Sequence, residues 1–271
     1  MELEVISHRP VAQAHATPLL FVHGAYAGAW IWEPYFLPYF ATRGYQAHAL
    51  SLRGHGNSDG RENLISARLR DYVADVEQVM ATLSAPPVLI GHSMGGVVVQ
   101  HLMHRHSDLL PGAVLMASGP PHGLVGSLWN MTFERPELLW QIIQVELFGP
   151  LSVDDSWVRR ALFSEHTPLA VVRRAIPRLD RESLMVCLDL LGLDLPPSTR
   201  MLEMPVLVLG AERDAFIYQG ALEQTGKTYG VTPEVFSGMA HAMMIDYDWE
   251  KAALRILQWL EVTLPAARSA A

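Results

Sequence analysis

The sequence predicts an α/β domain whose mainly parallel sheet carries helices on both faces. Short apolar runs alternate along the chain with longer amphipathic stretches, which is the pattern of buried strands joined by helices. Half of the 271 residues are hydrophobic and 18% are charged, so the chain is able to bury a sizeable core. The third observation is segment 91–95, GHSMG, which joins a strand-like run to a helix-like one.

Seven apolar runs are expected to form the strands of this sheet. Each is short, as strands are, and lies between segments that contain turn-forming or polar residues. In chain order they are residues 3–7, 19–23, 46–50, 88–90, 113–116, 206–209 and 234–236.

Two long segments are expected to be amphipathic helices of the core. Residues 65–83 place their apolar side chains on one face at a 3.6-residue period. Residues 249–262 form the second helix, with Asp248 as its N-cap.

The alternation of strands and helices stops between about residues 120 and 200. Pro-Pro pairs at 120–121 and 196–197 bound this segment, and no strand signal occurs inside it. Helix-like patterns fill it at residues 138–148, 155–163 and 183–191. We therefore predict a core domain of residues 1–120 and 200–271, with residues 121–199 inserted as a helical cap. Such a cap lies over the strand ends, where open α/β sheets bind ligands.

Composition excludes several classes of partner. The net charge of −8, with both signs interspersed, argues against nucleic acid, which requires clustered Lys and Arg. Cys187 is the only cysteine, so neither an intrachain disulfide nor a cysteine metal cluster is expected. The chain starts without a secretory signal pattern and contains no apolar run long enough to span a bilayer, which predicts a cytoplasmic protein. Interleaved charges in the cap argue against membrane contact, and monomer and homodimer both stay open.

Ser93 is the candidate nucleophile. A sharp turn from strand to helix exposes the hydroxyl of its central residue, and the flanking glycines avoid clashes with nearby backbone. His241 is the candidate base, because it lies on a loop between the last predicted strand and the final helix. Asp214, beyond the end of strand 206–209, is the candidate acid that orients it, with Glu212 as the alternative on the same loop.

The other titratable residues near these motifs are given structural roles. His92 is expected to point away from the nucleophile, His55 to be a turn residue and Asp246 to lie at the surface. A final group of histidines is interpreted as solvated helix residues rather than as a metal cluster: His101, His104 and His106.

Two backbone amides are expected to bind an oxyanion. One belongs to Met94, directly after the nucleophile, and the other to Ala25, on the loop after strand 19–23. Gly24 allows the backbone of that loop to approach closely.

At this point the chain resembles the α/β-hydrolase superfamily. The motifs that carry the resemblance are residues 23–24 (HG), 53–58 (RGHGNS), 91–96 (GHSMGG), Asp214 and 238–241 (GMAH). The resemblance implies a mostly parallel sheet of eight strands, a lid after the sixth strand, and no cofactor.

Within this superfamily, residues 23–30 are similar to a group of plant esterases and hydroxynitrile lyases. The lyases of that group carry threonine where this chain has Gly24 and lysine where it has Ala242, which favours ester hydrolysis. Epoxide hydrolases and haloalkane dehalogenases carry aspartate at the position of Ser93 and are disfavoured.

These features predict a serine hydrolase that cleaves a carboxylic ester or lactone of a neutral, fairly apolar small molecule. Tyr26, Trp30, Trp129 and Trp140 are the candidate substrate-binding residues. Other apolar cap residues either join them or pack the cap onto the core: Met131, Phe133, Leu138, Leu139, Ile142, Ile143 and Phe148. A C–C bond hydrolase or cofactor-free perhydrolase with the same triad is an alternative, as is a slow-turnover receptor.

Overall fold

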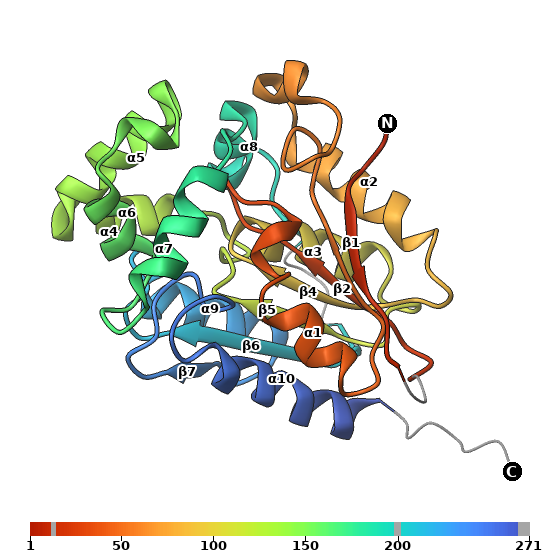
Figure 1. The fold of residues 1–271 in the computed structure, drawn as a ribbon. Helices are drawn as coiled ribbons and strands as arrows, with labels where there is room; N and C mark the ends of the chain where they lie inside the picture. The colour runs from red at the N-terminus through yellow and green to blue at the C-terminus, as the bar shows by residue number, and fades with distance from the viewer. Residues whose placement is uncertain (12–14, 198–201, 265–271) are drawn as a thin grey trace, which may run out of the picture.

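The computed structural model describes residues 1–11, 15–197 and 202–264. These residues form a seven-stranded sheet with the spatial order β1-β3-β2-β4-β5-β6-β7 (Figure 1). The strands are β1 (Val5–His8), β2 (Leu19–Val22), β3 (Ala47–Leu50), β4 (Val88–His92), β5 (Ala113–Met116), β6 (Val206–Ala211) and β7 (Glu234–Phe236). β1 is antiparallel to β3, and all other neighbours are parallel. Each predicted run overlaps one of these strands.

The sheet has one strand fewer than the resemblance implies. Within the described ranges β1 pairs with β3 alone and forms the edge of the sheet, so no eighth strand lies beyond it. The long helical segment therefore follows the fifth strand of the chain and not the sixth.

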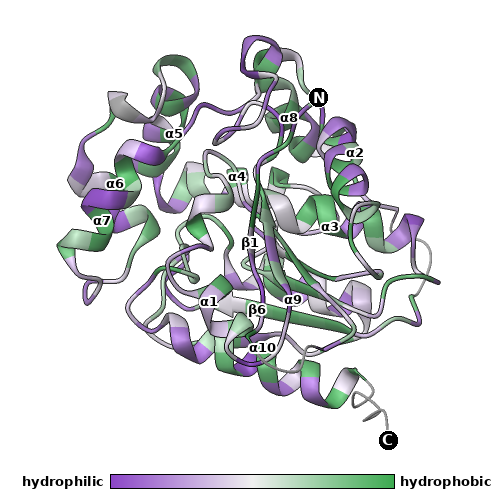
Figure 2. Ribbon diagram, turned by 45° about the vertical axis from the view of Figure 1, so that its right-hand side comes forward, coloured by the Kyte–Doolittle hydropathy of each residue, from purple (hydrophilic) through white to green (hydrophobic). Residues whose placement is uncertain are grey.

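Helices cover both faces of the sheet, as predicted. On one face, α1 (Phe36–Ala41) and α10 (Trp249–Thr263) pack on alternate residues of the strands, such as Leu19 and Phe21, whose side chains point to that face. On the other face, α2 (Leu69–Met80), α3 (Met94–Arg105) and α9 (Gln219–Tyr229) pack on Leu20 and Val22. In Figure 2, β6 is mostly hydrophobic, whereas α10 alternates between hydrophobic and hydrophilic residues. The core thus occupies two layers, one on each side of the sheet.

The helix predicted at residues 65–83 begins later in the chain than the regular spacing of its apolar residues indicates. A 3-10 turn spans Arg61–Ser66, and Ile65 is exposed. The backbone then extends through Arg68, whose amide donates to the Asp71 side chain at 2.8 Å in a capping box. This capping interaction starts α2 at Leu69. At α10 the start is at Trp249 as expected, although the Asp248 side chain pairs with Lys251 (2.8 Å) and does not cap the helix.

The segment between β5 and β6 is helical, as predicted. It contains α4 (Val125–Glu134), α5 (Pro136–Phe148), α6 (Asp155–Leu162), α7 (Leu169–Ala175) and α8 (Leu184–Leu188), with α8 continuing into a π-helical turn at Asp189–Leu193. Helices α4–α7 gather at one end of the molecule, with α8 beside them (Figure 1). The predicted cap end at residue 199 lies outside the described residues. Among the residues that are described, no helix is long and apolar enough to cross a membrane.

Candidate active site

Ser93 occupies the turn between β4 and α3 in a strained conformation. Its φ of 53° and ψ of −119° are uncommon for a residue with a side chain. The Ser93 amide donates to the carbonyl of Met116 at 3.1 Å, and the Ser93 carbonyl accepts from Gly119 at 3.1 Å, so the end of β5 holds the turn. A Cβ atom on Gly95 would lie 2.3 Å from the carbonyl oxygen of His23. The turn therefore leaves no room for a side chain at Gly95.

Gly95→Ala is expected to destabilise the protein, because the added methyl group meets backbone that is unable to move aside. Overpacking of this kind typically costs about 1–3 kcal/mol, which urea denaturation will measure as a loss in the free energy of unfolding. Gly126→Ala is the control, because a Cβ there would meet the end of the Tyr218 side chain, 3.0 Å from its hydroxyl, rather than backbone. Equal stability of the two variants would contradict this account of the turn.

The structure brings together Ser93, His241 and Asp214. His241 Nε2 lies 3.1 Å from Ser93 Oγ, and His241 Nδ1 lies 2.8 Å from Asp214 Oδ2. Asp214 Oδ1 accepts from the amides of Phe216 (2.8 Å) and Ile217 (2.9 Å), which fixes the carboxylate. A hydrogen on Nδ1 facing Asp214 leaves Nε2 free to accept the serine proton.

Glu212, the alternative acid, does not reach the histidine. Its side chain is exposed and accepts hydrogen bonds from the hydroxyl of Ser237 (2.8 Å) and the amide of Gly238 (2.7 Å). The geometry thus pairs His241 with Asp214.

Two further side chains hold the loop that carries His241. The Nε2 of His92 donates to the carbonyl of His241 at 2.9 Å, and its ring lies 4.7 Å from the His241 ring. The prediction that Asp246 lies at the surface is wrong, because its side chain is buried and accepts from the amide of Ala240 at 2.7 Å. The other Asp246 oxygen accepts from Ser164 (2.6 Å) and from Thr167 in the cap. Nothing in the local sequence indicates that these distant donors meet Asp246.

The loop after β2, residues 23–28, lies directly against Ser93. A Cβ on Gly24 would be 2.8 Å from Ser93 Cβ, so only glycine fits this approach. His23 shapes the loop, because its Nδ1 donates to the Gly24 carbonyl (2.8 Å) and its Nε2 accepts from the Leu52 amide (3.0 Å). Burial lowers the pKa of His23 to about 3, which keeps the ring neutral and able to accept.

The amides expected to bind an oxyanion flank this contact. Ala25 follows Gly24 on the β2 loop, and Met94 is the first residue of α3. First-turn amides of a helix have no acceptor within the helix, so the amide of Met94 is available to a ligand. Both amides belong to residues that border the same cavity as Ser93.

That cavity has a volume of about 360 Å³ and a mostly apolar wall, to which loops at the strand ends and helices between β5 and β6 contribute. Tyr26 and Trp30 line it, as expected. The structure does not place Trp129 and Trp140 there: these side chains are 69% and 62% exposed. Helical periodicity explains the difference, because inward residues alternate with outward ones on α4 and α5. The cap residues that do line the wall include Leu128, Met131, Leu139, Ile142 and Ile143.

The remaining apolar cap residues take other positions. Phe133 and Phe148 are exposed, whereas Leu138 packs in a small cluster with Met131 and Ala161. The chain therefore uses only part of its apolar cap surface to enclose the cavity.

Sequence reasoning missed Glu146, a carboxyl group in this apolar wall. It accepts hydrogen bonds from the hydroxyl of Tyr26 and from the thiol of Cys187 (3.1 Å). Burial raises the pKa of Glu146 above its usual range. Its spacing of four residues from Ile142 places both on one face of α5, which is the signal that could have indicated it.

The other histidines are less solvated than predicted. His101 is buried, and burial lowers its pKa, whereas His106 bonds to Glu77 at 2.8 Å. His55 lies in the bend after β3, as expected, but it is buried against Glu182 from the cap. No group of His, Cys, Asp or Glu within the described ranges is arranged to hold a metal ion.

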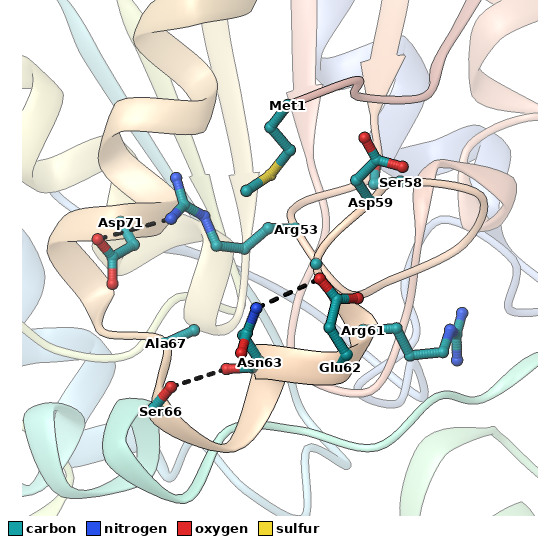
Figure 3. Close-up of a pocket in the computed structure, with 11 residues that line it drawn as sticks. Met1, Arg53, Ser58, Asp59, Arg61, Glu62, Asn63, Ser66, Ala67 and Asp71 are labelled. Atoms are coloured by element: carbon teal, nitrogen blue, oxygen red, sulfur yellow. Dashed lines mark hydrogen bonds and ion pairs between the residues drawn. The ribbon is translucent and has the colours of Figure 1, made fainter.

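A second hollow, of about 620 Å³, lies near the N-terminus (Figure 3). The residues that line it do not include Ser93, His241 or Asp214. Polar side chains in this hollow interact with one another: Arg53 forms an ion pair with Asp71 at 3.6 Å, and Asn63 donates a hydrogen bond to Glu62 at 3.2 Å. The cavity beside Ser93 is therefore the candidate active site.

Comparison with known proteins agrees with this fold. The chain is 28% identical over 102 residues to a pyrethroid hydrolase of Sphingobium wenxiniae, and 35% identical over 106 residues to polyneuridine aldehyde esterase of Rauvolfia serpentina. Each match covers 38% of this chain, and they cover only 36% and 39% of the two relatives. A thermophilic esterase from Thermogutta terrifontis has the same fold, with a TM-score of 0.74 at 20% identity over 96% of this chain and 93% of that one. Residues 19–253 match the model of the alpha/beta hydrolase family, and the chain belongs to that family.

Proposed function

We propose that the protein is a serine hydrolase that cleaves a carboxylic ester or lactone of a neutral, largely apolar small molecule. The observation that carries this proposal is the continuous hydrogen-bonded series from Asp214 through His241 to Ser93, which opens on an apolar cavity. The helical segment of residues 121–199 acts in this proposal as the cap that closes the cavity.

The proposed reaction has two halves. His241 Nε2 takes the Ser93 proton as Oγ bonds to the ester carbonyl carbon, and Asp214 stabilises the imidazolium. The amides of Ala25 and Met94 bind the resulting oxyanion. The tetrahedral intermediate then expels the alcohol, which takes its proton from His241 and leaves an acyl-enzyme. Water, deprotonated by His241, attacks the acyl-enzyme, and the proton returns to Ser93 as the acid departs.

The cavity wall supports a neutral substrate. The described residues that form it include no Lys or Arg to neutralise a carboxylate. The adjacent arginine pairs at 159–160 and 173–174 lie on α6 and α7 outside this wall. The apolar side chains would bind the hydrocarbon parts of a substrate through the hydrophobic effect.

A panel of p-nitrophenyl esters, lactones, dienoates and peroxide tests this function. We expect turnover of esters or lactones, and stoichiometric labelling by a fluorophosphonate. Turnover of dienoates alone would favour C–C bond hydrolysis, and peroxide-dependent activity alone would favour a perhydrolase. Rapid labelling with no turnover of any compound would favour a receptor.

The cavity also predicts which cap residues set chain-length preference. Ile142→Trp adds volume inside the wall and is expected to lower kcat/KM for a p-nitrophenyl hexanoate by about tenfold or more, with little effect on the acetate. Trp140→Ala, on the exposed side of the same helix, is the matched control and should leave both values nearly unchanged. A larger effect from Trp140→Ala would place the substrate elsewhere.

A further inference from the structure

Hydrogen bonds from cap residues fix the loop that carries Ala25 at its next residue, Tyr26. Tyr26 has a φ of 63°, a left-handed conformation that a non-glycine residue keeps only where its neighbours enforce it. Its carbonyl oxygen accepts from the amide of Asp180 at 2.7 Å, and its own amide donates to Glu182 Oε2 at 3.4 Å. Its hydroxyl donates to Glu146. All three partners lie between β5 and β6.

Glu182 is the centre of these contacts. Its buried carboxylate accepts through Oε1 from the hydroxyl of Tyr72 (2.6 Å) and the amide of Ser183 (2.7 Å). Oε2 lies 3.2 Å from Nε2 of His55, close enough for attraction between a carboxylate and a protonated ring. The other ring nitrogen of His55 donates to the Arg53 carbonyl at 3.0 Å. Residues from the loops after β2 and β3, from α2 and from the cap thus converge on one carboxylate.

The contact between Glu182 and His55 shifts the pKa of each group toward its charged form. Burial alone would raise the pKa of Glu182, yet His55 and the surrounding donors lower it. Burial likewise opposes a charge on His55, yet the facing carboxylate raises its pKa. An ionised carboxylate accepts a stronger hydrogen bond than a neutral group, which strengthens its hold on the amide of Tyr26.

We propose that Glu182 is a positioning residue, which fixes the backbone at Tyr26 so that the neighbouring Ala25 amide points at the oxyanion. This inference rests on the proposed esterase function. An oxyanion donor acts on charge that develops in the transition state. Loss of Glu182 will therefore weaken transition-state binding more than it weakens substrate binding.

Glu182→Gln is the test variant. It keeps the size of the side chain but removes its charge, and its NH2 group faces donors at one of the two oxygen positions that Glu182 fills. We expect kcat for a p-nitrophenyl ester to fall about 10- to 100-fold, the effect of a small misplacement of a reacting group, with KM nearly unchanged. The inhibition constant of an alkylboronic acid, which forms a tetrahedral adduct with the serine, should rise by the same factor.

Asp189→Asn is the matched control. Asp189 is also a buried cap carboxylate that joins cap to core, but its hydrogen bonds go to Arg68 and to the amide of Leu69 (2.9 Å). It should lower Tm without changing kcat or boronate affinity. Tyr72→Phe removes one donor from Glu182 and should reproduce the Glu182→Gln pattern with a smaller factor, which keeps the test decisive if Glu182→Gln fails to fold.

Two results would overturn the proposal. One is a rise in KM with unchanged kcat and boronate affinity in the Glu182 and Tyr72 variants, and the other is the full pattern in Asp189→Asn. A wild-type protein that neither hydrolyses esters nor binds boronate would instead reject the proposed function, so the two failures are distinguishable.

Discussion

Ser93→Ala is expected to lower kcat for the best ester substrate on the order of 10⁴- to 10⁶-fold, because it removes the hydroxyl that would form the proposed acyl-enzyme. The Ser93 hydroxyl lies 3.1 Å from His241 Nε2, and no second nucleophile in the described cavity wall shares that contact. Steady-state kinetics with p-nitrophenyl esters will measure the loss, and labelling by fluorophosphonate should disappear with it.

Ser127→Ala is the matched control for this variant. Ser127 is a second buried serine of the same cavity wall, and its hydroxyl has no hydrogen-bond partner in the described structure. Its replacement should leave kcat within a few-fold of wild type. Comparable losses in the two variants would show that the serine hydroxyls contribute to the shape of the cavity rather than to the reaction.

Asp214→Asn is expected to lower kcat on the order of 10⁴-fold with little change in KM, because an amide no longer selects the productive tautomer of His241. The carboxylate contacts Nδ1 at 2.8 Å and is itself held by two backbone amides, so the geometry of the variant should be preserved. The measurement is kcat and KM at neutral pH, together with Tm to confirm folding.

Glu212→Gln provides the comparison for Asp214. Glu212 lies on the same loop, yet its exposed carboxylate bonds to Ser237 and Gly238. Its replacement should leave kcat nearly unchanged. A large loss in Glu212→Gln with a small one in Asp214→Asn would reverse the assignment of the acid.

The strands and the Ser93 turn were predictable because their signals are local. Each strand is a short apolar run, and a glycine-flanked serine between a strand and a helix specifies the turn. The pairing of Asp214 with His241 also followed, because residues at the carboxyl ends of parallel strands meet at one edge of the sheet.

Contacts between distant segments were not predictable from one sequence. Asp246 accepts from Ser164 and Thr167, and Glu182 meets His55, yet none of these residues has a local pattern that indicates its partner. The wrong prediction for the two tryptophans has a different cause. Apolar character alone does not tell which face of α4 or α5 turns toward the cavity, and Trp129 and Trp140 lie on the outer faces.

Rapid-quench mass spectrometry of the wild-type protein tests the central claim most directly. Mixed with an excess of a p-nitrophenyl ester and quenched within the first turnover, the protein should gain the mass of one acyl group. Peptide mapping should place that group on Ser93, and Ser93→Ala should gain none. Steady ester turnover with no acyl adduct at any quench time, or an adduct on another residue, would contradict the account.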